Sequence, residues 1–255
     1  MKRAIRWVLN HIPRRWLQRL AGWAVPVMGL AYVGRGRHCP ICGTRRRRFL
    51  PYGYVTTRED ALCPGCLSLE RHRAIWLWIT RNTDLLNSHP RLLHIAPEVS
   101  LMGRFRKLYT TSDYITADLE SPLADMHFDV QHIPLESRSF DVVICNHLFE
   151  HVEDDRRAMR ELYRIMRPGG WGIMIVPEDR SRMMTYEDDT ITDPEQRTAL
   201  FGQYDHRRIY GCDYDDRLRQ AGFRVERISC SDMLTPEERA LYATANDDIV
   251  VVYKD

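Results

Sequence analysis

From Arg91 to the C-terminus, short apolar runs alternate with amphipathic segments. Three amphipathic segments have helical spacing, Leu101–Leu108, Glu153–Met166 and Cys212–Ala221, and the last two are expected to stop at Pro168-Gly169-Gly170 and at Gly222. Such alternation is typical of an α/β fold in which helices connect the strands of a parallel sheet. Only the loop 229–248 separates the last two runs, so we expect the sheet to end in an antiparallel strand. The seven strand candidates are Leu92–Ala96, Tyr114–Ala117, Met126–Val130, Val142–Asn146, Gly172–Val176, Arg224–Ile228 and Ile249–Tyr253.

Before this region lie two segments of different composition. The chain has 255 residues, which is enough for one α/β domain and a small appendage. Its net charge is only +2, but residues 1–50 are basic and contain no Asp or Glu. We therefore divide the chain into a basic leader (1–36), a cysteine-bearing module (37–67) and the main domain (68–255).

The leader is predicted to contact a membrane surface without crossing the membrane. Its longest uncharged stretch, Leu20–Gly34, has 15 residues and is interrupted by proline and glycines, so it is too short to span. Six basic residues and three tryptophans in the first 23 positions favour a helix lying on an anionic membrane. Two alternatives remain open: a basic segment that follows RNA phosphates together with Arg45–Arg48, and a terminal helix packed on the domain.

Four of the seven cysteines form two close pairs, Cys39-Pro-Ile-Cys42 and Cys63-Pro-Gly-Cys66, with 20 residues between the pairs. Two such knuckles can bring four thiolates around one tetrahedral Zn²⁺ ion. The spacing predicts a zinc ribbon with Cys39, Cys42, Cys63 and Cys66 as ligands. Because all four coordination positions are filled by protein, we expect the metal to be structural. An odd number of cysteines with this clustering indicates a reducing compartment.

The segment from Ser139 to Val152, with the helix that runs to Pro168-Gly169-Gly170, carries a family resemblance. It resembles the fourth strand, the following helix and the entry to the fifth strand of class I S-adenosylmethionine-dependent methyltransferases of the type 11 kind. The resemblance covers residues 90–255. It implies a Rossmann-like sheet of seven strands and S-adenosylmethionine as the cofactor.

Cofactor residues are expected just after the strands, because ligands of open parallel sheets bind beyond the carboxyl ends of the strands. Asp118 would accept hydrogen bonds from the ribose hydroxyls. By resemblance, Asp129 would meet the adenine amino group and Val130 would lie against the adenine ring. Asn146 and His147 would line the methionine end.

The loop after the first strand departs from the family pattern. Where the family carries an acidic residue and a glycine-rich motif, this chain reads His94-Ile95-Ala96-Pro97-Glu98-Val99-Ser100. Ala96 is still small, and Glu98 is expected to supply a carboxylate for the cofactor's ammonium group. This loop and the cysteine knuckles together resemble one subfamily of bacterial methyltransferase-like proteins. The alternative is a domain that has lost cofactor binding.

The segment 177–213 is a polar and aromatic insertion, which in this family tends to cover the active site. Within it, His206 next to Asp205 is the candidate general base, because a histidine titrates near neutral pH. A hydrogen-bonded loop histidine is the alternative role, and His151 is expected to be structural or close to the cofactor. The carboxylates of the insertion could also hold a divalent metal, although their spacing does not require one.

These features predict a cytoplasmic methyltransferase, associated peripherally with the inner face of the membrane, that acts on a small-molecule or lipid-linked acceptor such as a glycan precursor. The alternatives are an rRNA or tRNA methyltransferase, and a zinc-ribbon adaptor without catalysis. A cytoplasmic location is expected because export would separate the enzyme from its cofactor.

Overall fold

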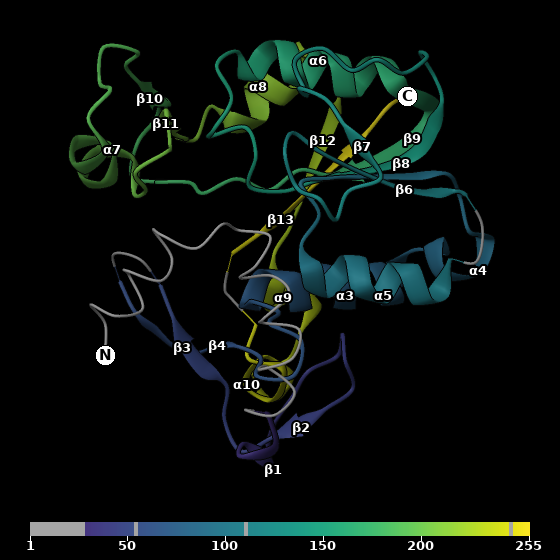
Figure 1. Cartoon of the computed structure of the whole chain (residues 1–255), viewed down its shortest axis with the longest axis vertical. Coiled ribbons are helices and arrows are strands. Elements are labelled where there is room, and N and C mark those ends of the chain that lie inside the picture. The colour runs from purple at the N-terminus through teal and green to yellow at the C-terminus, as the bar shows by residue number, and fades with distance from the viewer. Residues whose placement is uncertain (1–28, 54–55, 110–111, 245–246) are drawn as a thin grey trace.

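A computed structural model of the chain describes residues 29–53, 56–109, 112–244 and 247–255. Its main element is a seven-stranded sheet with the strand order β12-β13-β9-β8-β5-β6-β7 (Figure 1). All neighbours are parallel except β13, which is antiparallel to both β12 and β9. The strands are β5 (Leu92–Ile95), β6 (Tyr114–Asp118), β7 (Met126–His127), β8 (Phe140–Cys145), β9 (Met166–Ile173), β12 (Arg224–Ile228) and β13 (Ile249–Tyr253).

The seven predicted strands and the antiparallel last strand are confirmed, although β7 ends at His127 and not at Val130, and β9 runs from Met166 to Ile173 and not from Gly172 to Val176. The helix α6 (Asp155–Ile165) ends before Pro168-Gly169-Gly170, as predicted, and that segment lies inside β9, which begins directly after the helix. There the register between β8 and β9 shifts. A Cβ atom on Gly170 would lie 2.7 Å from the carbonyl oxygen of Asp141, so the close approach of two backbones requires glycine.

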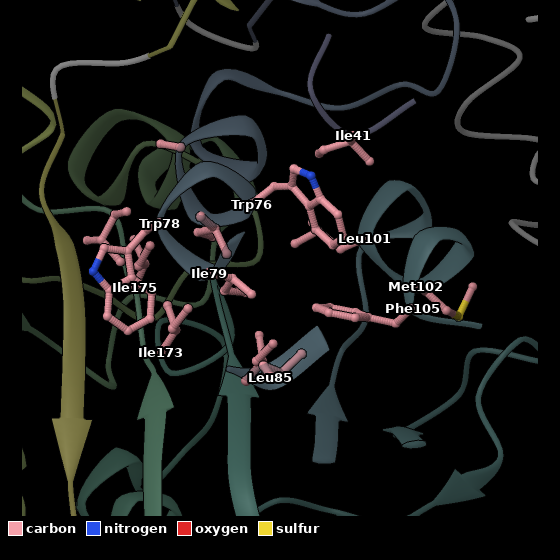
Figure 2. Packing of buried hydrophobic residues seen from close by; sticks show 14 of the residues in the cluster. Ile41, Trp76, Trp78, Ile79, Leu85, Leu101, Met102, Phe105, Ile173 and Ile175 are labelled. Atoms are coloured by element: carbon pink, nitrogen blue, oxygen red, sulfur yellow. The ribbon is translucent and has the colours of Figure 1, made fainter. Parts of the chain in front are cut away.

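Helices cover both faces of the sheet (Figure 1). On one face, α6 and α8 (Tyr214–Gln220) pack on a cluster that includes Phe140, Leu162 and Leu218. On the other face lie α3 (Glu70–Asn82) and α5 (Val99–Leu108). Figure 2 shows the second cluster, in which α3 directs its side chains both toward the sheet and toward α5.

The cysteine module is formed by four short strands and shares the second cluster. The hairpin β1 (Val33–His38) with β2 (Arg45–Arg46) and the hairpin β3 (Leu50–Tyr52) with β4 (Arg58–Leu62) lie below α3 in Figure 1. Ile41 of the module and Trp76 of α3 belong to one hydrophobic core (Figure 2). The module is therefore packed on the main domain, and β1 crosses the boundary that we expected at residue 36.

The insertion and the connections complete the chain. The segment 177–213 contains β10 (Tyr186–Glu187), which pairs with β11 (Arg208–Ile209), and helix α7 (Pro194–Phe201). The remaining short helices are α4 (Leu85–Ser88), α9 (Cys230–Met233) and α10 (Pro236–Tyr242). The basic helix predicted for the leader falls mainly on residues 1–28, outside the described residues. In the part that is described, no helix is long and apolar enough to cross a membrane.

Candidate functional site

The four cysteines predicted as metal ligands come together in one cluster. Their sulfur atoms all lie within 4.8 Å of one another, with Cys39 Sγ 3.6 Å from Cys66 Sγ and Cys42 Sγ 3.9 Å from Cys63 Sγ. Four sulfurs at about 2.3 Å from a central tetrahedral Zn²⁺ would be about 3.8 Å apart. The cluster therefore has the dimensions to hold one metal ion.

Both knuckles have the same backbone geometry, which is why two distant sequence segments can face one centre. The carbonyl of Cys39 accepts from Gly43 N at 2.9 Å, and the carbonyl of Cys63 accepts from Leu67 N at 2.9 Å. The residue after each second cysteine is left-handed, with φ of 71° at Gly43 and 60° at Leu67. This conformation is unstrained for glycine but strained for leucine.

Hydrogen bonds to the sulfur atoms favour thiolates in the cluster. The backbone N–H of Gly65 donates to Cys63 Sγ at 3.3 Å, and the Thr44 hydroxyl lies 3.1 Å from Cys42 Sγ. The hydrogen bond with Cys39 lowers the pKa of Cys63 to about 7 and also lowers the pKa of Cys42, whereas hydrogen bonds within the cluster raise the pKa values of Cys39 and Cys66. At least part of the cluster is thus ready to bind metal near neutral pH.

Arg73 joins the cysteine module to the main domain. Its guanidinium is fully buried and donates to the carbonyls of Ser68, Ala61, Tyr242 and Ala243. It also interacts electrostatically with Cys39, Cys63 and Cys66, so it opposes the negative charge that a four-thiolate centre carries.

At the carboxyl edge of the sheet, Glu98 occupies the place that the sequence predicted. It precedes α5, and its carboxylate accepts from His94 Nε2 at 2.7 Å and from Asn146 Nδ2 at 3.2 Å. Burial disfavours the charged form, but the hydrogen bond from His94 and the nearby His72 hold the pKa of Glu98 well below its usual range. Ala96 before it has a φ of 48°, so a side-chain-bearing residue takes up the left-handed turn where the family has glycine.

Two residues of α3 also belong to this site, and the sequence analysis did not identify them. His72 is buried, its Nδ1 accepts from Leu69 N at 3.2 Å, and its Nε2 lies 3.9 Å from Glu98 Oε1. Burial lowers the pKa of His72 to about 3, so its ring is neutral at pH 7. The Arg71 Nε is buried without a hydrogen-bond partner among the described residues. Of the charged groups that affect the pKa of Arg71, Glu98 has the largest effect. No sequence signal distinguished Arg71 from the many other arginines.

Asp118 and Asp129 lie at the ends of neighbouring strands, although Asp129 was expected inside its strand and lies two residues after the end of β7. Asp118 ends β6, and its Oδ1 accepts from Glu120 N at 2.9 Å and Ser121 N at 2.8 Å. The Asp129 carboxylate is held by Gln131, through the backbone N–H and the side-chain amide. Val130 is buried at 4% exposure, so only a small part of it is available to a ligand.

The residues after β8 face the same edge. Asn146 is buried and ties the strands together, because its Nδ2 reaches Glu98 and its Oδ1 accepts from Ile175 N at 3.2 Å. His147 follows with a left-handed φ of 51° and a half-buried ring. The structure therefore brings Glu98, Asn146 and His147 together, while Asp118 and Asp129 lie farther along the edge.

Beside His147 is a cavity of about 780 Å³. Its walls come from the cysteine module (including Arg58 and Asp60), from Arg71 of α3 and from residues after β9 such as Glu178. Four of its arginines are ion-paired: Arg37 with Asp60, Arg58 with Glu70, Arg180 with Asp248, and Arg227 with Glu178. Arg71 forms no such ion pair with the described residues, so it is available to an anionic group.

The expected pairing of Asp205 with His206 is not observed. Asp205 Oδ2 lies 3.4 Å from His151 Nδ1, and His206 Nδ1 instead bonds the Phe201 carbonyl at 2.9 Å. Adjacent residues in a turn point in different directions, which the spacing alone could not reveal. Burial lowers the pKa of His206, so its ring is neutral and Nε2 is the nitrogen with a free lone pair.

Comparison with known proteins identifies the central part of the chain. Residues 91–174 match the family described as "Methyltransferase domain". A Mycolicibacterium smegmatis protein described as "Probable S-adenosylmethionine-dependent methyltransferase" is 27% identical over 100 residues, which are 39% of this chain and 35% of that protein. The "Uncharacterized 37.1 kDa protein in transposon TN4556" of Streptomyces fradiae is 35% identical over 60 residues, 24% of this chain and 17% of that protein. The chain thus spans about a third or less of the length of these relatives.

Among solved structures, the YcgJ protein of Bacillus subtilis is similar over 72% of this chain and 99% of that chain, with 13% identity and a TM-score of 0.47. The family match covers β5, β6, β7, β8 and β9, the part of the sheet that carries Glu98, Asp118, Asn146 and His147. Residues 91–174 are therefore similar to a methyltransferase domain.

Proposed function

We propose that the protein transfers the methyl group of S-adenosylmethionine to a small-molecule acceptor bound in the cavity between the cysteine module and the carboxyl edge of the sheet. S-adenosylmethionine supplies an electrophilic methyl group on a sulfonium. The observation that carries the proposal is the pair of opposite charges at this edge: the carboxylate of Glu98, held by His94 and Asn146, and the guanidinium of Arg71, which has no ion pair in the part of the chain that the structure describes. An amino-acid moiety has an ammonium group for the first and a carboxylate for the second.

The other predicted cofactor residues have complementary roles in this proposal. Asp118 Oδ2 forms no hydrogen bond with the described residues and would accept from the ribose hydroxyls. Asp129 and Val130 would meet the adenine, and Ala96 would allow close approach of the backbone. His147 lines both the cofactor edge and the acceptor cavity, so the methyl group would be presented there.

The acceptor is proposed to be a small or lipid-linked molecule, with a glycan precursor as the favoured class. The cavity volume of about 780 Å³ suits a ligand of that size. For the base, His206 remains our candidate: its neutral Nε2 could take the proton that leaves the acceptor as the new bond to carbon forms. We further propose that the ion in the cysteine cluster is Zn²⁺ and that it shapes one wall of the cavity, and that residues 1–36 hold the enzyme at the inner face of the membrane.

Calorimetry with two ligands tests the cofactor site. S-adenosylhomocysteine has the amino-acid end and 5′-methylthioadenosine lacks it. Asp118→Ala should weaken the binding of both by about 10- to 100-fold, since each loses charge-assisted hydrogen bonds. Arg71→Met should weaken only S-adenosylhomocysteine, by a similar factor. Arg104→Met, an exposed arginine of α5, is the matched control and should change neither.

Two results would reject the proposal. Failure of the wild-type protein to bind S-adenosylhomocysteine would leave only the adaptor alternative. An equal effect of Arg71→Met on both ligands would show that the amino-acid end of the cofactor does not bind at this edge. The acceptor itself can be found by mass spectrometry of metabolite, lipid and RNA pools from a deletion strain, in which the substrate lacks one CH₂ group. If the difference were confined to RNA, the acceptor would be RNA and not a small molecule.

A further inference from the structure

A second group of potential metal ligands lies just beyond the carboxyl end of β8. Glu150 and His151 follow the strand, and His206 reaches them from the insertion. One ligand atom of each residue lies within 4.8 Å of the others, and the two imidazole rings are 4.8 Å apart in an edge-to-face arrangement. Residues 55 positions apart thus present one carboxylate and two imidazoles to a common point.

Of the three residues, Glu150 has the least favourable environment when no ligand is bound. It is fully buried, and neither carboxylate oxygen has a hydrogen-bond partner among the described residues. The nearest ring nitrogen is His147 Nδ1, 3.3 Å from Oε1 but without hydrogen-bond alignment. A buried carboxylate without donors costs several kcal/mol, so this side chain is unfavourable unless a cation or a strong donor occupies the space in front of it.

Both histidines are oriented as metal ligands usually are. His151 directs Nδ1 toward the carboxylate of Asp205 at 3.4 Å, and His206 directs Nδ1 to the Phe201 carbonyl at 2.9 Å. In metal sites the nitrogen that does not bind the metal typically donates to a carboxylate or a carbonyl, which fixes the ring and its tautomer. The nitrogen left for coordination is then Nε2 in each ring.

The backbone around the three residues is rigidly held. Arg208 is buried at 3% exposure and donates to the carbonyls of Phe149, Val152 and Glu153. The Arg207 N–H donates to the Glu150 carbonyl at 2.8 Å. These bonds fasten the insertion to the turn after β8, so Glu150, His151 and His206 are positioned before any ion binds.

We propose that Glu150, His151 and His206 bind a divalent transition-metal ion, in a second metal site separate from the four cysteines. Imidazole and carboxylate ligands suit Zn²⁺, Fe²⁺, Co²⁺ and similar ions. Three protein ligands leave a coordination position open, in contrast to the closed four-cysteine cluster. That position can take water or an oxygen of the acceptor; this last role rests on the proposed methyl transfer, whereas metal binding does not. Nε2 of His206 cannot hold a metal ion and accept a proton at once, so this inference replaces the base role of His206.

Metal analysis of the full chain tests the proposal. After the purified protein is equilibrated with Zn²⁺ and dialysed, the wild type should carry two ions per chain. Glu150→Gln and His206→Ala should each carry one, and His132→Ala, an exposed histidine outside the site, should keep two. S-adenosylhomocysteine binding is measured on the same samples, so that loss of the metal site and loss of the cofactor site are distinguished.

A spectroscopic readout keeps the proposal falsifiable if a variant folds poorly. In the Co²⁺-substituted wild type, intense thiolate-to-cobalt charge-transfer bands report the cysteines, and weaker ligand-field bands report the second ion. Addition of the second equivalent of Co²⁺ should add only the weaker bands, and Asp205→Asn should reduce the affinity for that equivalent by about 10-fold. A wild type that saturates at one ion per chain with Zn²⁺ and with Co²⁺ would overturn the proposal and return His206 to the role of base.

Discussion

The cysteine module and the carboxyl edge of the sheet assemble their functional residues in opposite ways. In the module, each pair of ligands belongs to one tight knuckle, and the two knuckles repeat the same backbone bonds. At the sheet edge, Glu98, Asn146 and Arg71 come from a loop, a strand end and a helix that are far apart in sequence.

This difference determines how each region should respond to change. The module has little core of its own, since Ile41 and Phe49 share a cluster with α3, and its order depends on the cysteines and on Arg73. The sheet edge rests on a large core and depends on charge balance among buried groups. We expect the module to be sensitive to loss of a ligand and the edge to be sensitive to pH.

The largest effect is expected from removal of a cysteine ligand. Cys63→Ser should release the ion and lower the free energy of unfolding by about 3 kcal/mol or more, because metal affinity contributes directly to folding. Chemical denaturation with metal analysis measures both quantities. Cys212→Ser is the control, since Cys212 lies outside the cluster, and an equal loss in the two variants would contradict the role of the cluster.

Arg73→Met should have the next largest effect, because it leaves four backbone carbonyls without their buried donor. We expect a loss of about 3 kcal/mol in the free energy of unfolding and weaker metal retention in the module. Arg104→Met removes an exposed guanidinium over Trp76 and should change stability by less than about 1 kcal/mol. If both variants were equally stable, the module would not depend on Arg73.

At the sheet edge, acid should destabilise the protein through His72. Its pKa is about 3 in the folded state because of burial, below its value of about 6.5 when unfolded. The contribution is fully present above pH 6.5 and is lost as the pH falls toward 3, because the unfolded chain binds the proton first. Between pH 7 and pH 5 the loss in the free energy of unfolding amounts to about 2 kcal/mol. Urea unfolding at both pH values should show a smaller loss in His72→Gln; an unchanged loss would show that other groups cause it.

The smallest change in stability is expected from two substitutions that compare the two knuckles with each other. Gly43→Ala should lower stability by about 1 kcal/mol, because the left-handed φ of 71° is unfavourable for alanine and no atom lies near the new Cβ. Leu67→Gly should relieve the same strain in the second knuckle and raise stability by about 0.5 kcal/mol, after the entropy cost of glycine. Thermal unfolding of the two variants measures both signs, and destabilisation by Leu67→Gly would show that its side-chain packing outweighs the strain.

The sequence predicted the sheet well because periodic apolar runs depend on local pattern. Two predicted strands, Arg224–Ile228 and Ile249–Tyr253, have the bounds that the structure shows. The sequence also predicted that the helix stops before Pro168-Gly169-Gly170, but not that this segment forms a strand irregularity packed against β8. Glu98 was found from its position in a motif, whereas Arg71 and His72 were not, because nothing local indicates that α3 covers that motif.

Local sequence pattern is sufficient to specify the order of strands along the chain, the two cysteine knuckles and the residues after each strand. These depend on residue type and spacing over a few positions. Tertiary packing determines that, among the described residues, Arg71 has no ion-pair partner and Glu150 is buried without a donor, and that His206 turns away from Asp205. Partners, burial and charge balance depend on which distant segments pack together, and that information is spread over the whole core.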